Sequence, residues 1–311
     1  MTSPALWAVT AYFNPLHYRR RRENFHVFRR GLGVPLLAVE LSFDGSFELD
    51  DGDADIIVRL TGGDIMWQKE RLLNLGIRQL PADCSKVACL DCDILFGNAD
   101  WGTQTAELLE HSPMVQPFSR ANYLDRDWLS GMNQRAATTF ALPSVAFDVA
   151  NGASLDAIMA PPGAHGRSNV LLGFAWAFRR ELIERHGLYA ACIAGGGDTA
   201  LVCAAWGIPE AVVLRHAMNE HQAHCYRDWA QPFHAAVQGR IGCLEGDVFH
   251  LWHGKLEDRQ ALERHRIVRQ LEFDPLHDIT SDAGGGWRWN SDKPHLHAYL
   301  RQYFSARKED G

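Results

Sequence analysis

The sequence of 311 residues has no long apolar run. Nowhere do about 18 apolar residues follow one another, as a membrane-spanning helix requires. The opening stretch, MTSPALWAVTAYFNP, also lacks the basic segment and apolar stretch of a secretion signal. Internal repeats and low-complexity tracts are absent as well. We therefore expect an unexported, cytoplasmic protein with no membrane span.

The sequence is poor in cysteines that could pair. Its seven cysteines are an odd number and lie scattered through apolar segments, which is typical of buried thiols in a reducing compartment. Cys89 and Cys92 spell C-x-x-C, but no second pair follows at zinc-ribbon spacing. A metal or redox pair therefore stays the weaker alternative to core cysteines.

An excess of positive charge is also absent. The formal net charge is −7 and the pI is about 6.1, which argues against a protein that coats duplex nucleic acid by bulk electrostatics. A local basic groove is still compatible with this balance. Small or neutral partners are the better expectation.

Hydrophobic residues make up 46% of the chain, enough for one elaborated domain or two smaller ones. Periodicity in the first third predicts alternating strands and helices, and this alternation favours an α/β fold with a mostly parallel central sheet covered by helices on both faces. The expected strands are residues 6–10, 35–41, 54–60, 87–90 and 114–118, and the expected helices are residues 18–32 and 66–80.

The pattern dissolves after residue 118. Residues 119–169 are rich in Gly, Pro, Ala, Ser and Asn without clear periodicity, and we expect a lid or an acceptor-binding insertion there. A strand then leads into a helix that stops at Gly187. A charged helix at about 255–271 and a closing helix at about 293–307 complete the chain.

Two acids end the apolar run of VACLDCDILFGN. Alternation along a strand places Asp91 and Asp93 on one face, at the carboxyl end where α/β sheets bind ligands. Two adjacent carboxylates repel each other, and a divalent cation with oxygen ligands such as Mg²⁺ or Mn²⁺ neutralises them economically. Capping or salt-bridged acids at a strand end are the plainer alternative.

An apolar strand ending in D-x-D resembles the metal-binding motif of the GT-A superfamily of nucleotide-sugar-dependent glycosyltransferases. GFAWAFRRELIERHGLY followed by GGGDTAL is similar to the acceptor-side region of inverting β-1,4-galactosyltransferases and chondroitin-type polymerases. FHLWHG resembles the histidine segment that completes the metal site there and in polypeptide N-acetylgalactosaminyltransferases. The resemblance implies a Rossmann-like GT-A domain over residues 1–254, with a C-terminal helical extension, residues 255–311, packed on it.

By this resemblance, Asp93 ligates the metal directly and Asp91 reaches the metal or the donor ribose. His253 is the third protein ligand, and His250 is its rival because the spacing does not separate them. Imidazole favours Mn²⁺ over Mg²⁺ as the ion. The implied donor is a nucleotide-diphosphate sugar, with a UDP-sugar as first choice.

Asp198 is the implied catalytic base, which takes the proton of the acceptor hydroxyl. Gly196 and Gly197 precede it and would let an acceptor approach the backbone closely. The alternative is that Asp198 is the N-cap of a helix over residues 199–206. Thr199 stands where the relatives carry a second acid, which is a departure from their pattern at the implied base.

The donor-binding residues follow from analogy alone. Lys69 or Arg71 would reach the diphosphate, with a solvated helix face as the alternative. Trp176 would stack on a sugar, with a core position as the alternative. The residues expected to hold the nucleotide base are Thr10, Tyr12 and Asn14.

The sequence therefore predicts a glycosyltransferase of the hexosyltransferase type. A phosphatase or phosphotransferase of the haloacid dehalogenase type fits poorly, because Asp93 is followed by Ile94 and Leu95 rather than by a hydroxyl residue. A sugar-nucleotide-binding module without turnover is a further alternative. The acceptor stays open between a glycan or polysaccharide and a modified nucleobase of the phage type.

Overall fold

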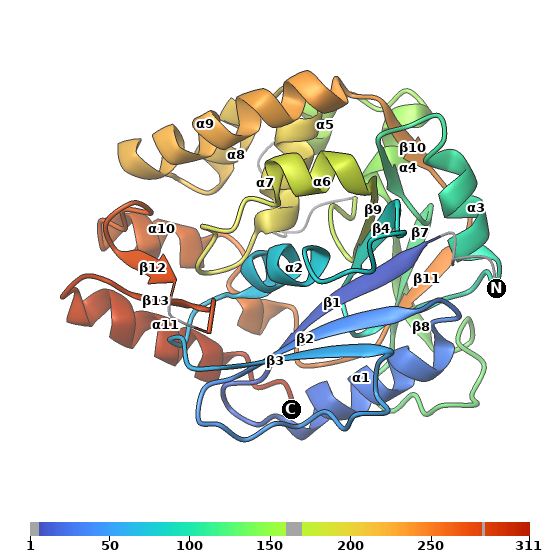
Figure 1. Cartoon of the computed structure of the whole chain (residues 1–311), viewed down its shortest axis with the longest axis horizontal. Helices are drawn as coiled ribbons and strands as arrows, with labels where there is room; N and C mark the ends of the chain where they lie inside the picture. The colour runs from blue at the N-terminus through green and yellow to red at the C-terminus, as the bar shows by residue number, and fades with distance from the viewer. Residues whose placement is uncertain (1–5, 160–169, 282–283) are drawn as a thin grey trace.

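The computed structural model describes residues 6–159, 170–281 and 284–311, and a seven-stranded sheet lies at its centre (Figure 1). The order is β10-β6-β9-β4-β1-β2-β3; β1 runs parallel to β2 and β4, and β9 runs antiparallel to β4 and β6. The predicted α/β class with a mostly parallel sheet is confirmed. The strands are β1 (Trp7–Phe13), β2 (Leu36–Ser42), β3 (Ile56–Thr61), β4 (Lys86–Leu90), β6 (Met114–Gln116), β9 (Ala175–Arg179) and β10 (Ile241–Cys243).

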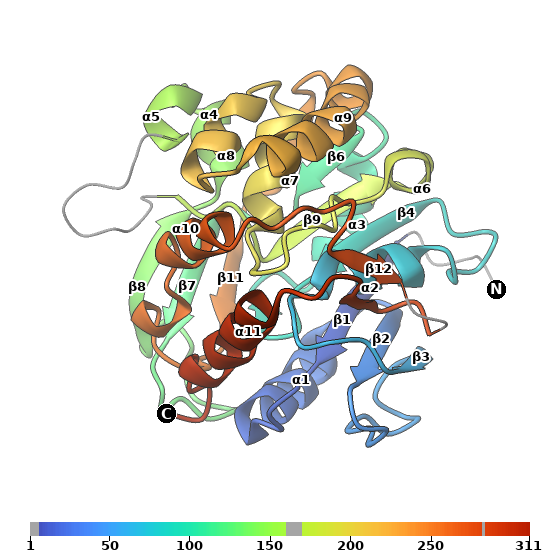
Figure 2. The same ribbon diagram turned by 90° about the vertical axis from the view of Figure 1, so that its left-hand side faces the viewer.

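Alternation along β1 divides the core into two layers. Val9, Ala11 and Phe13 belong to one cluster of buried residues, whereas Ala8 and Tyr12 belong to the other. Helices α2 (Lys69–Ile77), α6 (Arg180–His186), α7 (Gly197–Ala205) and α9 (Glu220–Val237) cover the first face (Figure 2). Helices α1 (Arg19–Gly31) and α3 (Trp101–Leu108) cover the other face.

A second sheet occupies part of the region expected to be a lid or an acceptor-binding insertion. Its order is β5-β11-β7-β8, with β5 (Ile94–Phe96), β7 (Arg120–Leu124), β8 (Thr138–Pro143) and β11 (Asp247–His250). Helices α4 (Val145–Ala150) and α5 (Leu155–Met159) follow. Residues 119–159 therefore contain regular strands and helices, although their sequence shows no clear periodicity. In β7 every residue after Arg120 is buried, so the alternation that marks a strand is missing. Residues 160–169 lie outside the described residues.

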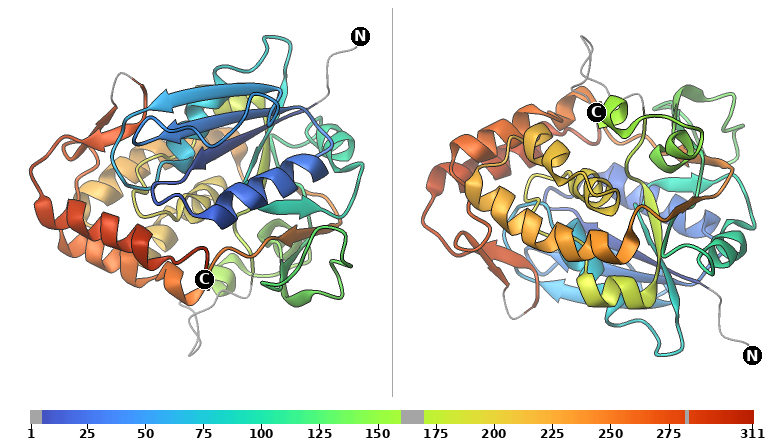
Figure 3. Two further views of the ribbon diagram at one scale, coloured as in Figure 1. Left: turned by 90° about the horizontal axis from the view of Figure 1, so that it is seen from below. Right: turned by 90° about the horizontal axis from the view of Figure 1, so that it is seen from above.

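The C-terminal segment packs across the molecule (Figure 3). The predicted charged helix is two pieces, η1 (Glu257–Arg259) and α10 (Glu263–Gln270), because Gln260 adopts φ +46 between them. The hairpin β12 (Ile279–Ser281) and β13 (Trp287–Trp289) then leads to α11 (Pro294–Ala306), close to the predicted closing helix. Helix α8 (Pro209–Arg215) joins α7 to α9.

The last residues return to the first helix. Tyr18, the N-cap of α1, makes no side-chain capping bond. The Asp310 carboxylate accepts hydrogen bonds from the backbone nitrogens of Arg19 (3.2 Å) and Arg20 (2.8 Å) instead. Figure 1 shows the C-terminus beside α1.

All seven cysteines are free, and Cys89 and Cys92 are buried, so the prediction of core thiols is confirmed. Among the helices of the described residues, none combines the length and hydrophobicity needed to cross a membrane.

Candidate active site at the carboxyl end of the central strands

The two acids of the D-x-D motif lie in a turn. Strand β4 ends at Leu90 and β5 begins at Ile94, so Asp91 and Asp93 belong to the connection between the two sheets. The Asp91 backbone nitrogen donates to the Phe174 carbonyl at 2.8 Å. The expectation that both acids extend from one face of a strand is therefore wrong, and they have different partners.

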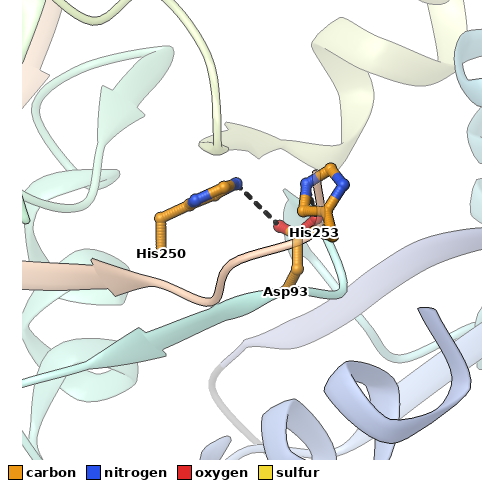
Figure 4. Close-up of side chains that lie close together, drawn as sticks. All are labelled: Asp93, His250 and His253. Atoms are coloured by element: carbon orange, nitrogen blue, oxygen red, sulfur yellow. Dashed lines mark ion pairs between the residues drawn. The ribbon is translucent and has the colours of Figure 1, made fainter. Parts of the chain in front are cut away.

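Strand pairing carries two histidines to Asp93. In the antiparallel pair of β11 and β5, His250 lies opposite Ile94, and the Leu251 nitrogen donates to the Asp93 carbonyl at 2.8 Å. His253 Nε2 lies 2.9 Å from Asp93 Oδ2, and His250 Nε2 lies 3.9 Å from Asp93 Oδ1 (Figure 4). One ligand atom from each of the three side chains lies within 4.8 Å of the others.

This cluster fits a divalent cation. Asp93 Oδ1 is buried and has no hydrogen-bond partner. Burial favours a raised pKa for Asp93, but the charges and hydrogen bond of His253, with His250 and Arg259, outweigh it and hold the pKa well below its usual range. Burial lowers the pKa of His250 well below its ordinary value, so that imidazole is neutral. An ionised carboxylate and a neutral imidazole are the ligand forms, and one oxygen with two nitrogens favours Mn²⁺ over Mg²⁺.

His253 lies between opposite charges. Its Nε2 is 3.0 Å from Arg259 Nη2 as well as 2.9 Å from Asp93, and its Nδ1 is 3.7 Å from Glu309 Oε1. Glu309 forms ion pairs with Arg21 (2.9 Å) and Arg307 (2.6 Å). The C-terminal segment therefore contacts the histidine that completes the cluster.

His250 is fixed by an aromatic ring. Phe174 stacks on it with a centroid distance of 4.6 Å and an interplanar angle of 4°. Phe174 adopts φ +77, which is rare for a bulky residue. The chain therefore accepts backbone strain at the point where Phe174 meets His250.

Lys69 joins the first acid of the motif, Asp91, to Asp198. Its Nζ lies 2.6 Å from Asp91 Oδ1 and 3.2 Å from both carboxylate oxygens of Asp198. Burial would lower the pKa of Lys69, but Asp198 and Asp91 raise it well above the ordinary value. Burial also raises the pKa of Asp91 to about 6, against the attraction of Lys69. Lys69 is thus held between two acids, and Asp91 stands apart from the Asp93 cluster.

Asp198 lies in the first turn of α7, two residues after the N-cap. The N-cap is Gly196, at φ +95, so the alternative interpretation of Asp198 as N-cap is wrong. A Cβ at Gly197 would lie 2.1 Å from Glu70 Oε1, and one at Gly173 would lie 2.5 Å from Asp198 Oδ2. These glycines make room for side chains of the protein itself.

A cavity of about 720 Å³ joins the two groups of acids. Its walls include η1 and α10 of the C-terminal segment as well as the ends of β4 and α7. The sequence-predicted site residues that line it are Lys69, Asp91, Asp93, Gly196, Asp198, His250 and His253.

Other predicted residues do not line this cavity. Thr10 Oγ1 donates to the Leu90 carbonyl at 2.8 Å inside the sheet. Trp176 is buried in the core and donates from Nε1 to the Leu172 carbonyl at 2.9 Å. The Arg71 guanidinium lies over the Trp287 ring, 4.7 Å from its centroid.

Tyr12 and Asn14 lie at a different small cavity, around Glu48. The Tyr12 hydroxyl donates to the Glu48 carboxylate, and Asn14 Nδ2 donates to it at 2.9 Å. His17 Nδ1 is 2.8 Å from the same carboxylate. The structure therefore does not bring the expected base-binding residues to the acidic clusters.

Sequence reasoning missed the basic wall of the cavity. Arg21, Arg259, Arg264 and Arg307 line it. Three of these come from the segment interpreted as a charged surface helix and a closing helix, and their only signal in the sequence was an abundance of arginine.

Comparisons with known proteins give remote structural matches only. No family model matches the sequence, and no curated protein matches it. TarS residues 1–349 from S. aureus, in complex with UDP-GlcNAc, is 10% identical, with coverage of 97% of this chain and 72% of that chain and a TM-score of 0.40. A putative nucleotide-diphospho-sugar transferase from Desulfovibrio desulfuricans is 8% identical, with coverage of 96% and 98% and a TM-score of 0.37.

The catalytic domain of Drosophila β1,4-galactosyltransferase 7, in complex with xylobiose, is 10% identical, with coverage of 94% and 97% and a TM-score of 0.34. The predicted resemblance to nucleotide-sugar glycosyltransferases has structural counterparts among these matches, each with a TM-score below 0.5. At these scores the function has to be argued from the residues of the site itself.

Proposed function

We propose that this protein is a metal-dependent glycosyltransferase that moves a sugar from a nucleotide-diphosphate sugar to an acceptor hydroxyl. One observation carries the proposal: Asp93, His250 and His253 gather their ligand atoms within 4.8 Å in the wall of a cavity that Asp198 also lines. A cation site and a separate carboxylate base in one cavity are the parts that such a transfer requires.

Asp93, His250 and His253 would hold the cation, with Mn²⁺ favoured by the two imidazoles. When bound, the cation would supply positive charge to the leaving diphosphate. The guanidinium of Arg259 lies beside His253 and would add charge at the same place. We assign the diphosphate of a UDP-sugar or a related donor to this end of the cavity.

Asp198 would act as the base at the other group of acids. The acceptor oxygen forms a bond to the anomeric carbon, its proton passes to the Asp198 carboxylate, and the bond from that carbon to the diphosphate oxygen breaks with its electron pair on the nucleotide. Attack opposite the leaving group inverts the anomeric centre. Lys69, with its Nζ 3.2 Å from both Asp198 oxygens, would orient this carboxylate.

The domain division is part of the proposal, with residues 1–254 as the transferase domain and 255–311 as the extension. Arg259, Arg264 and Arg307 of the extension line the cavity, which supports a direct role for it in binding. Tyr123 on β7 and Phe140 on β8 also line the cavity and support acceptor contacts by residues 119–169. The acceptor class, glycan or modified nucleobase, is addressed below.

The dehalogenase-type alternative requires Asp91 as a free nucleophile. Its Oδ1 lies 2.6 Å from Lys69 Nζ, and the two histidines gather at Asp93. This arrangement favours the transferase. Retention of Asp198 in the cavity likewise favours turnover over a binding module.

A thermal-shift screen tests the proposal. The protein is heated with UDP-, GDP-, TDP- and CDP-sugars, each with Mn²⁺ or with EDTA, because a ligand of the native state raises the melting temperature. We expect one nucleotide class to raise the Tm only with Mn²⁺, and the same sugar nucleotide to be hydrolysed slowly without an acceptor. If none of the nucleotides shifts the Tm in either condition, the proposal is wrong.

A further inference from the structure

Two arginines in the cavity wall have no acid partner among the described residues 6–159, 170–281 and 284–311. Arg215 ends α8 and Arg264 lies in the first turn of α10, and both line the 720 Å³ cavity. Among the residues that the structure describes, neither guanidinium has a carboxylate oxygen within 4.0 Å. Burial lowers the pKa of Arg215, as expected for a guanidinium that is partly removed from water.

The contacts of Arg264 orient its guanidinium without neutralising it. Nη1 donates to the Tyr303 hydroxyl at 2.7 Å and to the Arg259 carbonyl at 3.4 Å, and Nε donates to His265 Nε2 at 3.4 Å. These acceptors are formally neutral. A guanidinium has five N–H donors, so Arg264 keeps donors for a ligand.

A stacked pair of histidines adjoins both arginines. The His216 and His265 rings lie 3.8 Å apart at an interplanar angle of 7°, and both line the cavity. Burial, with the charges of Arg264 and Arg215, lowers the pKa of His216 to about 3, and burial also holds the pKa of His265 well below its ordinary value. The histidines are therefore neutral, and the charge at this wall is that of the two arginines.

The group of Arg215, Arg264, His216 and His265 adjoins the segment that leads to the proposed base. A Cβ at Gly196 would lie 2.6 Å from His216 and 3.0 Å from His265, and a Cβ at Gly195 would lie 3.5 Å from Arg264 Nη1. The two glycines precede Asp198 by two and three positions. The guanidinium of Arg259, which is assigned to the diphosphate, contacts His253 at 3.0 Å.

We propose that Arg215 and Arg264, with the stacked His216 and His265, form a subsite for a phosphate or carboxylate group of the acceptor. The role of that group as part of an acceptor rests on the proposed function, whereas anion binding at the subsite does not. A planar fork of N–H donors binds either anion in bidentate fashion, and a chain of net charge −7 needs such local cations to hold an anionic acceptor.

The first experiment measures inorganic phosphate binding by the full chain saturated with UDP and Mn²⁺, which occupy the proposed donor site. We expect phosphate to raise the Tm of the wild type further, and Arg215→Gln to weaken its affinity at least tenfold while the shift with UDP and Mn²⁺ persists. Arg227→Gln is the matched control. Arg227 is an exposed arginine on α9 that pairs with Glu210 on α8, and its variant should bind phosphate like the wild type. Equal phosphate affinity in Arg215→Gln and wild type would overturn the subsite.

Failure of the donor proposal can be distinguished from failure of the anion subsite. If UDP with Mn²⁺ does not shift the Tm, the phosphate titration is repeated in EDTA without nucleotide, and its dependence on Arg215 still decides the subsite. Arg215→Lys separates charge from geometry and guards against misfolding of the glutamine variant. Retained affinity in Arg215→Lys supports a charge contact, and affinity unchanged in both variants overturns the proposal.

The second experiment compares glucose, glucose 6-phosphate and glucuronate as acceptors with the donor found in the screen. We expect the wild type to use one anionic acceptor at least tenfold better than glucose, and the better anion identifies the group. Arg215→Gln should lower transfer to that acceptor at least tenfold more than transfer to glucose. Equal use of all three acceptors by the wild type would count against the subsite.

Discussion

Asp91 and Asp93 are two residues apart, yet the structure gives them opposite surroundings. Asp91 Oδ1 is 2.6 Å from Lys69, a cation supplied by the chain, whereas Asp93 lies against two histidines and has one buried oxygen without a hydrogen bond. Burial raises the pKa of Asp91 to about 6, while His253, His250 and Arg259 overcome burial to depress that of Asp93. The two acids of one motif therefore differ in environment: Asp91 is neutralised within the protein, and Asp93 keeps a buried oxygen for the proposed cation.

The comparison predicts that only the second acid controls metal binding. Asp93→Asn should abolish the Mn²⁺-dependent thermal shift and reduce transfer below detection, because the carboxylate is the one anionic ligand of the cluster. Isothermal titration with Mn²⁺ checks this. Asp228→Asn, at an exposed aspartate on α9, is the control. A normal Mn²⁺ affinity in Asp93→Asn would contradict the assignment.

Asp198 should affect chemistry and leave binding intact. Asp198→Asn should lower transfer by roughly 10²- to 10⁴-fold, as expected for loss of a general base, with the UDP and Mn²⁺ shift near that of the wild type. Steady-state rates and thermal shifts measured on one preparation separate the two effects. Transfer at the parental rate would mean that the base lies elsewhere.

A substitution of Lys69 tests whether Asp91 is neutralised by a cation of the protein. Lys69→Met removes the cation between Asp91 and Asp198 and should destabilise the fold by roughly 3–5 kcal/mol, as for other broken buried pairs. The loss should be smaller at pH 5 than at pH 8, since Asp91 is protonated more readily at low pH. Urea unfolding at both pH values measures it. Lys69→Met with Asp91→Asn should recover part of the loss, and no recovery would contradict the pairing.

Glu70 gives the smallest predicted effect. Burial raises its pKa from 4.5 to about 7, so its contribution to stability is present in full below pH 4.5 and is lost as the pH rises through 7. The glutamine of Glu70→Gln cannot ionise. The free energy of unfolding of this variant should therefore rise relative to that of the wild type between pH 5 and pH 8, by up to about 3 kcal/mol. Denaturant midpoints across this range test the prediction. Parallel curves for the two proteins would show that Glu70 does not ionise in this window.

Local patterns predicted the framework of the site. The apolar runs located the four N-terminal strands, and the D-x-D and FHLWHG motifs located the three residues that cluster at Asp93. These signals survive because strand alternation and the order of motifs are properties of short segments. The register of β11 against β5, which brings His250 opposite Ile94, is a tertiary property, but it joins motifs already identified.

Long-range partners could not be read from the sequence. Lys69 was expected to face a diphosphate, but its partner Asp198 is 129 positions away. The buried strand β7 lacks an alternating pattern, and Arg259 and Arg264 look like ordinary surface charges of a helix. In each case the environment of the residue depends on neighbours that are distant in the sequence, and local sequence patterns do not predict those contacts.

The bond between Asp310 and the start of α1 has a consequence for the basic wall of the cavity. The first helix acquires its N-terminal cap from a residue 290 positions later, and Arg21 acquires its ion-pair partner from Glu309. The basic wall therefore depends on contact between the first helix and residues 309–310, because Glu309 also pairs with Arg307 of that wall. A substitution at Glu309 would leave two guanidiniums of the wall without their shared carboxylate.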